Sequence, residues 1–206
     1  MAETSADAMH RQDEGVYVQL TYDHLDVSSV MARVKSPDAG AVVLFAGTTR
    51  STFASKPVLR LTYQSYHPLA LATLVALARE VRAKHALTAV AVAHRLGPVP
   101  VGEESVLVAV SSPHRAAAWR GGEEALELTK ERAEIWKLEE FVGEGEEGAV
   151  WRANRDGKMG VRVGVGKGED EDGGIGAVAG GAGAGDGDGN GDGGLEDADG
   201  RGGEVR

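Results

Sequence analysis

Two lysines, Lys130 and Lys137, are the residues of this chain whose type and spacing most directly suggest chemistry. They are seven positions apart, so on one continuous helix they would share a face, separated by two turns or about 10 Å along the axis. Leu126 and Ala133 each precede one of these lysines by four positions. A lysine beside such apolar surface loses hydration, which makes its amine a better nucleophile or base.

Two other arrangements of this segment remain open. A competing apolar stripe would turn both lysines toward solvent; it runs through Ala125, Leu128, Arg132 and Ile135. A helix that breaks before Trp136 would remove the spacing argument, and the two lysines would then have to meet through tertiary structure.

A second group of polar residues lies where predicted strands end. His114 and Arg115 follow Ser111-Ser112-Pro113, at the point where a strand leads into a helix. The N-terminus of a helix favours anions, so with Arg115 this is a candidate phosphate site, and an ordinary polar helix start is the alternative. Arg50 closes a short polar turn after an apolar strand, and such loops often hold binding groups.

Composition excludes several classes of function. The chain has 206 residues, no cysteine and a formal net charge of −10. Without cysteine it has no disulfide, thiolate metal site or cysteine nucleophile, and its histidines lack metal-ligand spacing, so we expect neither a metal nor a cofactor. The acidic balance argues against a nonspecific nucleic-acid binder. No apolar run approaches the roughly 18 residues of a membrane span, and the start lacks a signal-peptide core, so we expect a cytosolic protein.

The glycines are concentrated at the C-terminal end, where residues 157–206 hold 20 of the 30, together with 11 acidic and 5 basic side chains. Such a segment cannot bury enough apolar surface to offset its ordering entropy, so we predict a disordered Gly/Asp-rich tail. Within it, residues 186–197 half-match a calcium loop, and 181–185 imitate a dinucleotide-binding loop. Neither has the flanking elements that such sites need.

The remaining pattern predicts a single α/β (α+β) domain over residues 16–156, after a disordered leader over 1–15. Strands are expected over 16–20, 41–45, 58–66, 88–94, 105–111 and 149–152, with 97–102 as a turn between two of them. Helices are expected from an Asp26 cap to Val34, from Pro68 to about Lys84, and from His114 into the 130s. Gly121-Gly122 weakens the last helix by roughly 1 kcal/mol per glycine.

Two of these strands carry a prediction about which side is buried. The continuous apolar run over 41–45 is expected to be covered on both faces. In the strand over 58–66, Leu59, Leu61 and Tyr63 alternate with polar residues and are expected to share the inner face.

Five blocks occur in order along the chain: G-A-V-V-L-F-A-G-T-T-R over 40–50, L-T-Y-Q-S-Y over 61–66, V-A-H-R-L-G over 92–97, V-S-S-P-H-R-A-A-A over 110–118 and K-E-R-A-E-I-W-K-L-E over 130–139. Together they closely resemble the large, catalytic subunit of molybdopterin synthase, in a collinear match from about residue 16 to residue 155. The H-R-x-G, S-x-H-R and I-W-K motifs make the resemblance specific.

The resemblance implies an α/β hammerhead-type fold and a dimer of large subunits at the centre of a heterotetramer. It implies a sulfurtransferase of molybdenum cofactor biosynthesis, which converts precursor Z, a cyclic pyranopterin monophosphate, to molybdopterin. Each of the two dithiolene sulfurs would arrive as a thiocarboxylate on the C-terminal Gly-Gly of a small ubiquitin-like partner. Such a carrier suits an enzyme that has no thiol of its own.

The resemblance also assigns roles around the two lysines. Lys130 matches the catalytic lysine that contacts the substrate. Lys137, with Leu138 and Glu139, matches a second lysine segment, which we expect to orient the thiocarboxylate or the substrate. The family often has proline where this chain has Glu134, and often a further lysine at the position of Leu138, so the helix end and this segment depart from the family pattern.

The other residues that the resemblance assigns to substrate binding are basic. His114 and Arg115 match the family's substrate-binding pair, Arg50 matches an arginine after the first long strand, and Arg155 matches a basic residue near the family's C-terminus. We expect these groups to hold the cyclic phosphate through charge-assisted hydrogen bonds. The alternative function is a non-catalytic scaffold that binds the tail of the ubiquitin-like partner.

Overall fold

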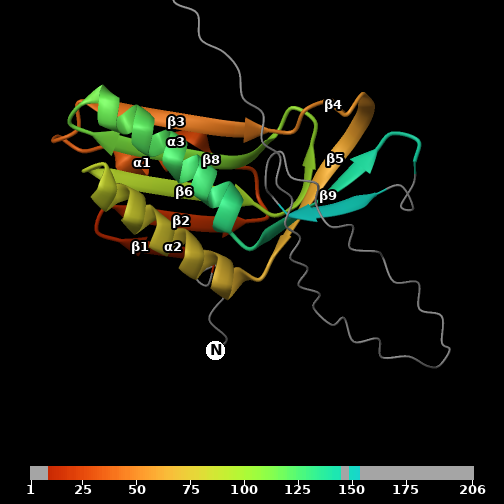
Figure 1. Cartoon of the computed structure of the whole chain (residues 1–206), viewed down its shortest axis with the longest axis horizontal. Coiled ribbons are helices and arrows are strands. Elements are labelled where there is room, and N and C mark those ends of the chain that lie inside the picture. The colour runs from red at the N-terminus through yellow and green to blue at the C-terminus, as the bar shows by residue number, and fades with distance from the viewer. Residues whose placement is uncertain (1–8, 145–148, 154–206) are drawn as a thin grey trace, which may run out of the picture. The chain divides into compact units, whose positions relative to one another are not determined.

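The computed structural model describes residues 9–144 and 149–153, and Figure 1 shows the arrangement of their elements. The tail expected over 157–206, with its calcium-like and glycine-rich motifs, lies outside the described residues. The helices are α1 (Val27–Val34), α2 (His67–Lys84) and α3 (Arg115–Arg132). The strands are β1 (His10–Asp13), β2 (Val16–Thr21), β3 (Ala41–Thr48), β4 (Thr52–Phe53), β5 (Lys56–Ser65), β6 (Ala89–Arg95), β7 (Gly97–Pro100), β8 (Glu104–Ser112), β9 (Ile135–Phe141) and β10 (Val150–Ala153).

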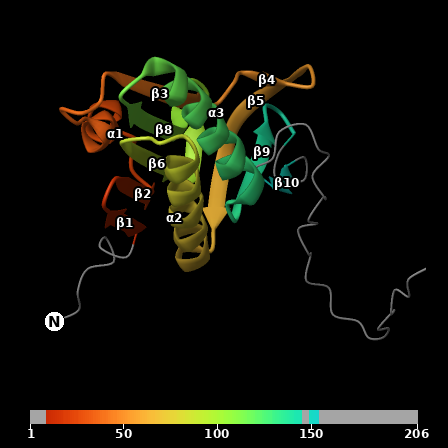
Figure 2. The same cartoon turned by 60° about the vertical axis from the view of Figure 1, so that its left-hand side comes forward.

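The larger sheet has the strand order β1-β2-β6-β8-β3, in which β2 and β6 are parallel and the other neighbours antiparallel. Successive side chains of a strand point to opposite faces. Val90 and Val92 therefore join the core beneath α2 and α3, whereas Ala91 and Ala93 join the core beneath α1. Figures 1 and 2 show α2 and α3 together over one face and α1 over the other. The predicted mixed α/β class is confirmed.

The helix starts follow the sequence signals. Asp26 caps α1 by accepting a hydrogen bond from the backbone N–H of Ser28 at 2.9 Å. Pro68 lies in the first turn of α2, where no intrahelical N–H is needed. Leu71, Leu74 and Val81 of α2 recur at helical spacing and are buried in the core.

The glycine pair in α3 does not interrupt the helix, because both residues are used for close packing. A Cβ at Gly121 would lie 2.8 Å from Cδ1 of Leu87, and one at Gly122 would lie 3.4 Å from Val43 and Val110. The cost in helix propensity is thus offset by the close approach of α3 to the sheet and to the loop that precedes β6.

The prediction that the strand over 41–45 is buried on both faces is wrong. β3 is the edge strand of the larger sheet, with β8 as its neighbour. Its residues are half-buried or exposed, and Phe45 is 36% exposed. A continuous apolar run does not distinguish a central strand from an edge that another surface could cover.

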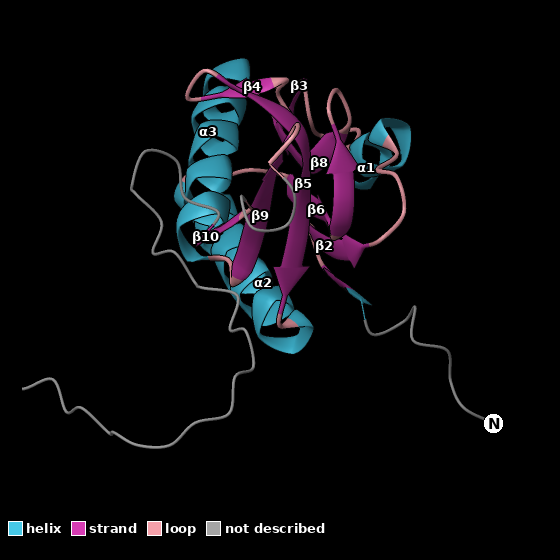
Figure 3. Cartoon of the chain, turned by 90° about the vertical axis from the view of Figure 1, so that its right-hand side faces the viewer, coloured by secondary structure: helices cyan, strands magenta, loops and turns pink. Residues whose placement is uncertain are grey.

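The smaller sheet has the order β10-β9-β5-β4 (Figure 3). The short strand β7 also pairs with β5. The register between β5 and β9 shifts between Val58 and Arg60, which leaves Leu59 as an extra residue. This bulge turns Leu59 outward, where it is 53% exposed, while Val58 and Tyr63 are buried. The prediction that Leu59 shares a face with Leu61 and Tyr63 is therefore wrong.

Two segments predicted to lack regular structure form strands. Residues 10–13 of the expected leader form β1, which pairs with β2 through a turn at Gly15 (φ 68°). Asp13 of β1 also forms an ion pair with Arg79 of α2. Residues 97–100 of the expected turn form β7 and pair with β5. β1 depends on pairing with β2, and β7 on pairing with the distant strand β5. Local turn signals in the sequence do not reveal such pairing. Among the described residues no helix is long and apolar enough to cross a membrane.

Candidate active site

A cavity of about 550 Å³ lies where the end of α3, the start of β4 and the strands β3, β5, β8 and β9 meet. Three of the basic residues singled out in the sequence line it, namely Arg50, Lys130 and Lys137, together with Glu139. Its other lining residues are Phe45, Ala46, Gly47, Thr48, Thr52, Phe53, Val58, Leu61, Tyr63, Ser105, Val106 and Thr129. Three cations and one carboxylate in a partly apolar cavity are suited to an anionic ligand.

The two lysines meet through tertiary structure and not along one helix. α3 ends at Arg132, and Ala133 has extended backbone angles (φ −65°, ψ 133°). Lys130 is thus in the last turn of α3, while Lys137 is on β9. Of the arrangements considered above, the helix break before Trp136 is the one observed, and the idea of a shared helical face is wrong.

The helix breaks even though Glu134 occupies the place where the family often has proline. Glu134 Oε1 accepts a hydrogen bond from Thr73 Oγ1 of α2 at 3.0 Å. Ile135, only 1% exposed, then enters the core as the first residue of β9. A proline at this position would end the helix by removing a backbone donor. In this chain the helix ends without it, and burial of Ile135 and the hydrogen bond of Glu134 accompany the break.

The pleat of β9 places Lys137 and Glu139 on one face of the strand and Leu138 on the other. Lys137 and Glu139 are paired in register with Tyr63 and Leu61 of β5, and all four line the cavity. Leu138 is paired with Thr62 on the opposite face and is not among the cavity-lining residues. The structure therefore brings Glu139 to the two lysines but does not bring Leu138 there.

Glu139 is the most buried charged group of the cavity, with 2% exposure. Its Oε1 lies 3.6 Å from Nζ of Lys137, and its Oε2 lies 3.0 Å from Nε of Arg152 on β10. The Arg152 N–H is not aimed at this oxygen, so the close contact is an ion pair without a hydrogen bond. One buried carboxylate is therefore shared between two cations.

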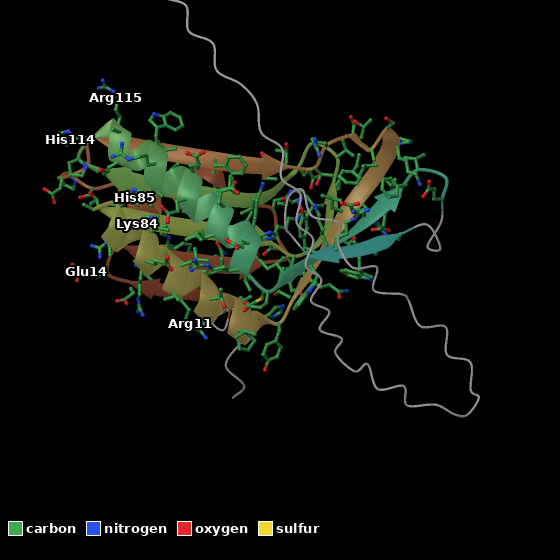
Figure 4. The ribbon with its side chains drawn as sticks, in the orientation of Figure 1. Arg11, Glu14, Lys84, His85, His114 and Arg115 are labelled. Carbon is green, nitrogen blue, oxygen red and sulfur yellow. The ribbon has the colours of Figure 1, made fainter. Side chains whose placement is uncertain are left out.

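His114 and Arg115 are at the opposite end of α3 from the cavity. His114 is the N-cap of α3 and Arg115 its first residue, and Figure 4 shows both at the end of the molecule where this helix begins. About 24 Å of helix separates His114 from Lys130. Within one chain the structure does not bring this pair to Arg50 and the lysines. Arg155 lies outside residues 9–144 and 149–153.

Sequence reasoning missed several residues of the cavity region. Tyr63 is 4% exposed, and its ring packs edge-on against His94 with centroids 4.9 Å apart. Burial lowers the pKa of His94 to about 4, so this ring is neutral behind the cavity wall. Phe53 and Thr129 also line the cavity. The alternation of β5 put Tyr63 on the inner face without indicating a cavity, and the contact of Arg152 depends on strand pairing that the sequence does not display.

Within residues 9–144 and 149–153, no group of three or more histidine, aspartate or glutamate side chains has the geometry to hold a metal ion.

Comparison with known proteins gives a consistent result. A family model described as MoaE protein matches residues 20–132. Proteins named molybdopterin synthase catalytic subunit are 61% identical in Neurospora crassa, over 73% of this chain and 72% of the relative, and 58% identical in Sclerotinia sclerotiorum, over 73% and 76%. The crystal structure of molybdopterin synthase from Staphylococcus aureus matches with a TM-score of 0.60 and 32% identity, over 65% of this chain and 94% of that one. A MoaE protein of molybdopterin biosynthesis from Burkholderia ambifaria matches with a TM-score of 0.56 and 25% identity, over 68% and 91%.

Proposed function

The chain belongs to the MoaE family and has a catalytic role in molybdopterin synthesis, and from this premise we propose the reaction and the groups that carry it. The substrate is precursor Z, and the sulfur donor is the thiocarboxylated C-terminal Gly-Gly of a small ubiquitin-like partner in the cytosol. The observation that carries the proposal is the cavity in which Arg50, Lys130 and Lys137 converge. Both proposed ligands, a cyclic phosphate and a thiocarboxylate, are anions that such a cavity would attract.

Lys130 is assigned the central catalytic role. Sulfur attack on the pterin side chain builds negative charge in the transition state, and a fixed ammonium group in the cavity stabilises such charge. An amine can also carry the proton that must move as the carbon–sulfur bond forms. Lys130 is fixed by the last turn of α3, whereas Lys137 projects from β9 into the same cavity. Lys137 then orients the thiocarboxylate or the substrate, and Arg50 holds the phosphate.

The distance between His114 and the cavity suggests how self-association completes the site. β3 is an apolar edge strand, and its last residues, Gly47 and Thr48, line the cavity. Its first residue follows Gly40, at which a Cβ would lie 2.6 Å from the carbonyl oxygen of Pro113, next to His114. Two copies that pair antiparallel through β3 about a twofold axis would bring the start of one strand beside the end of the other.

Such a dimer would place His114 and Arg115 of one copy near Arg50 and Lys130 of the second copy. Two exposed aromatic residues are suitable for burial there: Phe45, 36% exposed on β3, and Trp119, 65% exposed one turn before Gly122 on α3. Each dimer would then hold two sites, and with a small partner at each site the assembly would be a heterotetramer.

Reconstitution tests the reaction. The purified chain, the thiocarboxylated small partner and precursor Z should yield molybdopterin, and Lys130→Ala should abolish its formation. Inactivity of the unaltered chain with a partner that is active in another synthase would contradict the proposed reaction. Binding of the partner's tail without turnover would point to a scaffold.

Complementation between variants tests the shared site. Lys130→Ala and Arg115→Ala are each expected to be inactive alone. A mixed dimer of the two would contain one site with both native side chains, so mixing should restore activity to about a quarter of the unaltered level. A mixture that forms dimers but stays inactive would show that His114 and Arg115 do not act across the twofold axis.

A further inference from the structure

The strand β10 brings a further arginine to the cavity side of the smaller sheet. Arg152 is paired in register with Lys137 of β9, so both side chains are on the face that carries Glu139 and Leu61. The Arg152 side chain is 27% exposed, that of Lys137 15% and that of Glu139 3%. Arg152 is not a cavity-lining residue, so it would act on a ligand through its neighbours.

The two cations do not share Glu139 equally. The Arg152 contact is at 3.0 Å, whereas the Lys137 contact, at 3.6 Å, is longer than a hydrogen bond. Arg152 is therefore the nearer of the two counter-charges, and the three ammonium donors of Lys137 make no hydrogen bond to Glu139. If Arg152 were absent, the buried carboxylate would retain its charge and attract Lys137 into a direct hydrogen bond.

Arg152 has a second contact that fixes its position. Its guanidinium carbon lies 5.3 Å from the ring centroid of Phe53, within the range of a cation–π interaction. Phe53 is on β4 and lines the cavity. Arg152 thus contacts both the wall formed by β4 and the carboxylate on β9, and these two contacts fix its guanidinium group.

We propose that Arg152 is a positioning residue, which keeps Glu139 from binding Lys137 tightly and so leaves Lys137 available to an anionic ligand. This inference rests on the proposed function of Lys137. The alternative is that the Arg152–Glu139 pair only fastens β10 to β9.

Arg152→Gln separates these alternatives when it is compared with Arg60→Gln. Arg60 is a matched control because it forms an ion pair at 2.8 Å with Glu140, the residue after Glu139 on β9. This pair joins β9 to β5 on the face away from the cavity, whereas the Arg152–Glu139 pair joins β9 to β10. In the molybdopterin assay we expect kcat to fall about tenfold for Arg152→Gln and to stay within about twofold for Arg60→Gln. Arg152→Lys, which keeps a cation, should recover part of the loss. An unchanged kcat in Arg152→Gln, or an equal fall in the control, would overturn the proposal.

A double variant tests whether Arg152 acts through the carboxylate. If it does, adding Arg152→Gln to Glu139→Gln should reduce kcat by less than twofold further, since the group that captures Lys137 is already gone. A full additional tenfold loss would mean that Arg152 acts by another route, and the proposal would fail.

The position of Lys137 gives a readout that does not depend on activity. In a crystal structure of Arg152→Gln, the distance from Lys137 Nζ to Glu139 Oε1 should shorten from 3.6 Å to about 2.8 Å. An unchanged distance would overturn the inference. If the unaltered chain makes no molybdopterin, the proposed function fails, whereas this distance still tests the role of Arg152.

Discussion

The two faces of the smaller sheet carry the same kinds of charged side chains in very different states. On the outer face, Arg60 donates to both carboxylate oxygens of Glu140, each at 2.8 Å, and Thr62 adds a third hydrogen bond at 2.7 Å. On the cavity face, Glu139 has two cations close by, yet its Oε2 accepts no hydrogen bond from the described residues.

This difference arises from the pleat alone, because Glu139 and Glu140 are consecutive residues of β9. On the outer face, both carboxylate oxygens of Glu140 accept hydrogen bonds, so this ion pair has little to gain from a ligand. The cavity group keeps charge and donors that are not fully used, in a place that water reaches poorly, and such a group gains by binding a ligand. A charged cluster that looks imperfect is thus a better sign of function here than one with ideal geometry.

The largest expected difference between the two faces is in the free energy of unfolding after the carboxylate on each face is replaced by an amide. Glu139→Gln leaves Lys137 and Arg152 as cations without a counter-charge, and we expect the free energy of unfolding to fall by about 3 kcal/mol. Glu140→Gln leaves a guanidinium that water can solvate, with an expected loss of about 1 kcal/mol. Urea denaturation of the full chain measures both, and equal losses would contradict the comparison.

A smaller effect is expected from acid on the wall behind the cavity. The pKa of His94 is lowered by burial to about 4 in the folded protein, against 6.5 for the free side chain. The unfolded chain therefore takes up a proton first, and stability is lost as the pH falls from 6.5 toward 4. Between pH 6.5 and 5 we expect a loss of about 2 kcal/mol. Denaturation at several pH values should show this slope, and it should be absent in His94→Gln; an equal slope in that variant would refute the assignment.

The outer face should respond to acid in a different window. The hydrogen bond from Arg60, followed by that from Thr62, lowers the pKa of Glu140 below its ordinary 4.5. Its contribution is thus present above about pH 4.5 and is lost as the pH falls through the lower folded value. Below pH 4.5, Glu140→Gln should lose about 1 kcal/mol less stability than the unaltered chain. A difference between the two that appears already near pH 6 would assign the effect to another group.

The smallest effect is expected from Leu138→Lys, which introduces the lysine that the family often has at this position. Because Leu138 is paired with Thr62 on the outer face, its side chain does not enter the cavity, and we expect kcat to stay within about twofold. Steady-state assay of molybdopterin formation measures this. A rise or fall of tenfold would mean that the outer face also takes part in the reaction.

The sequence was sufficient for the elements that local signals specify. The Asp26 cap of α1 and Pro68 in the first turn of α2 are both confirmed. Each of these depends on neighbours within four residues, so no information about the rest of the fold is needed.

The parts of the cavity that were missed depend on partners far away in the chain. Lys130 and Lys137 line one cavity, but the argument from their spacing assumed one continuous helix, and α3 ends at Arg132. The outward turn of Leu59 follows from the register between β5 and β9, and the contact of Arg152 follows from the pairing of β10 with β9. Strand register depends on how both faces of the sheet are packed. The sequence of one strand alone does not contain this information.

The close packing at Gly121 and Gly122 has a consequence for the direction in which Lys130 projects. These glycines hold α3 against Leu87, Val43 and Val110, so the helix can neither slide nor rotate at that point. Inserting one residue between Gly122 and Lys130 would turn Lys130 by about 100° around the axis and take it out of the cavity. The number of residues between the glycines and Lys130 therefore fixes the side of α3 from which this lysine projects.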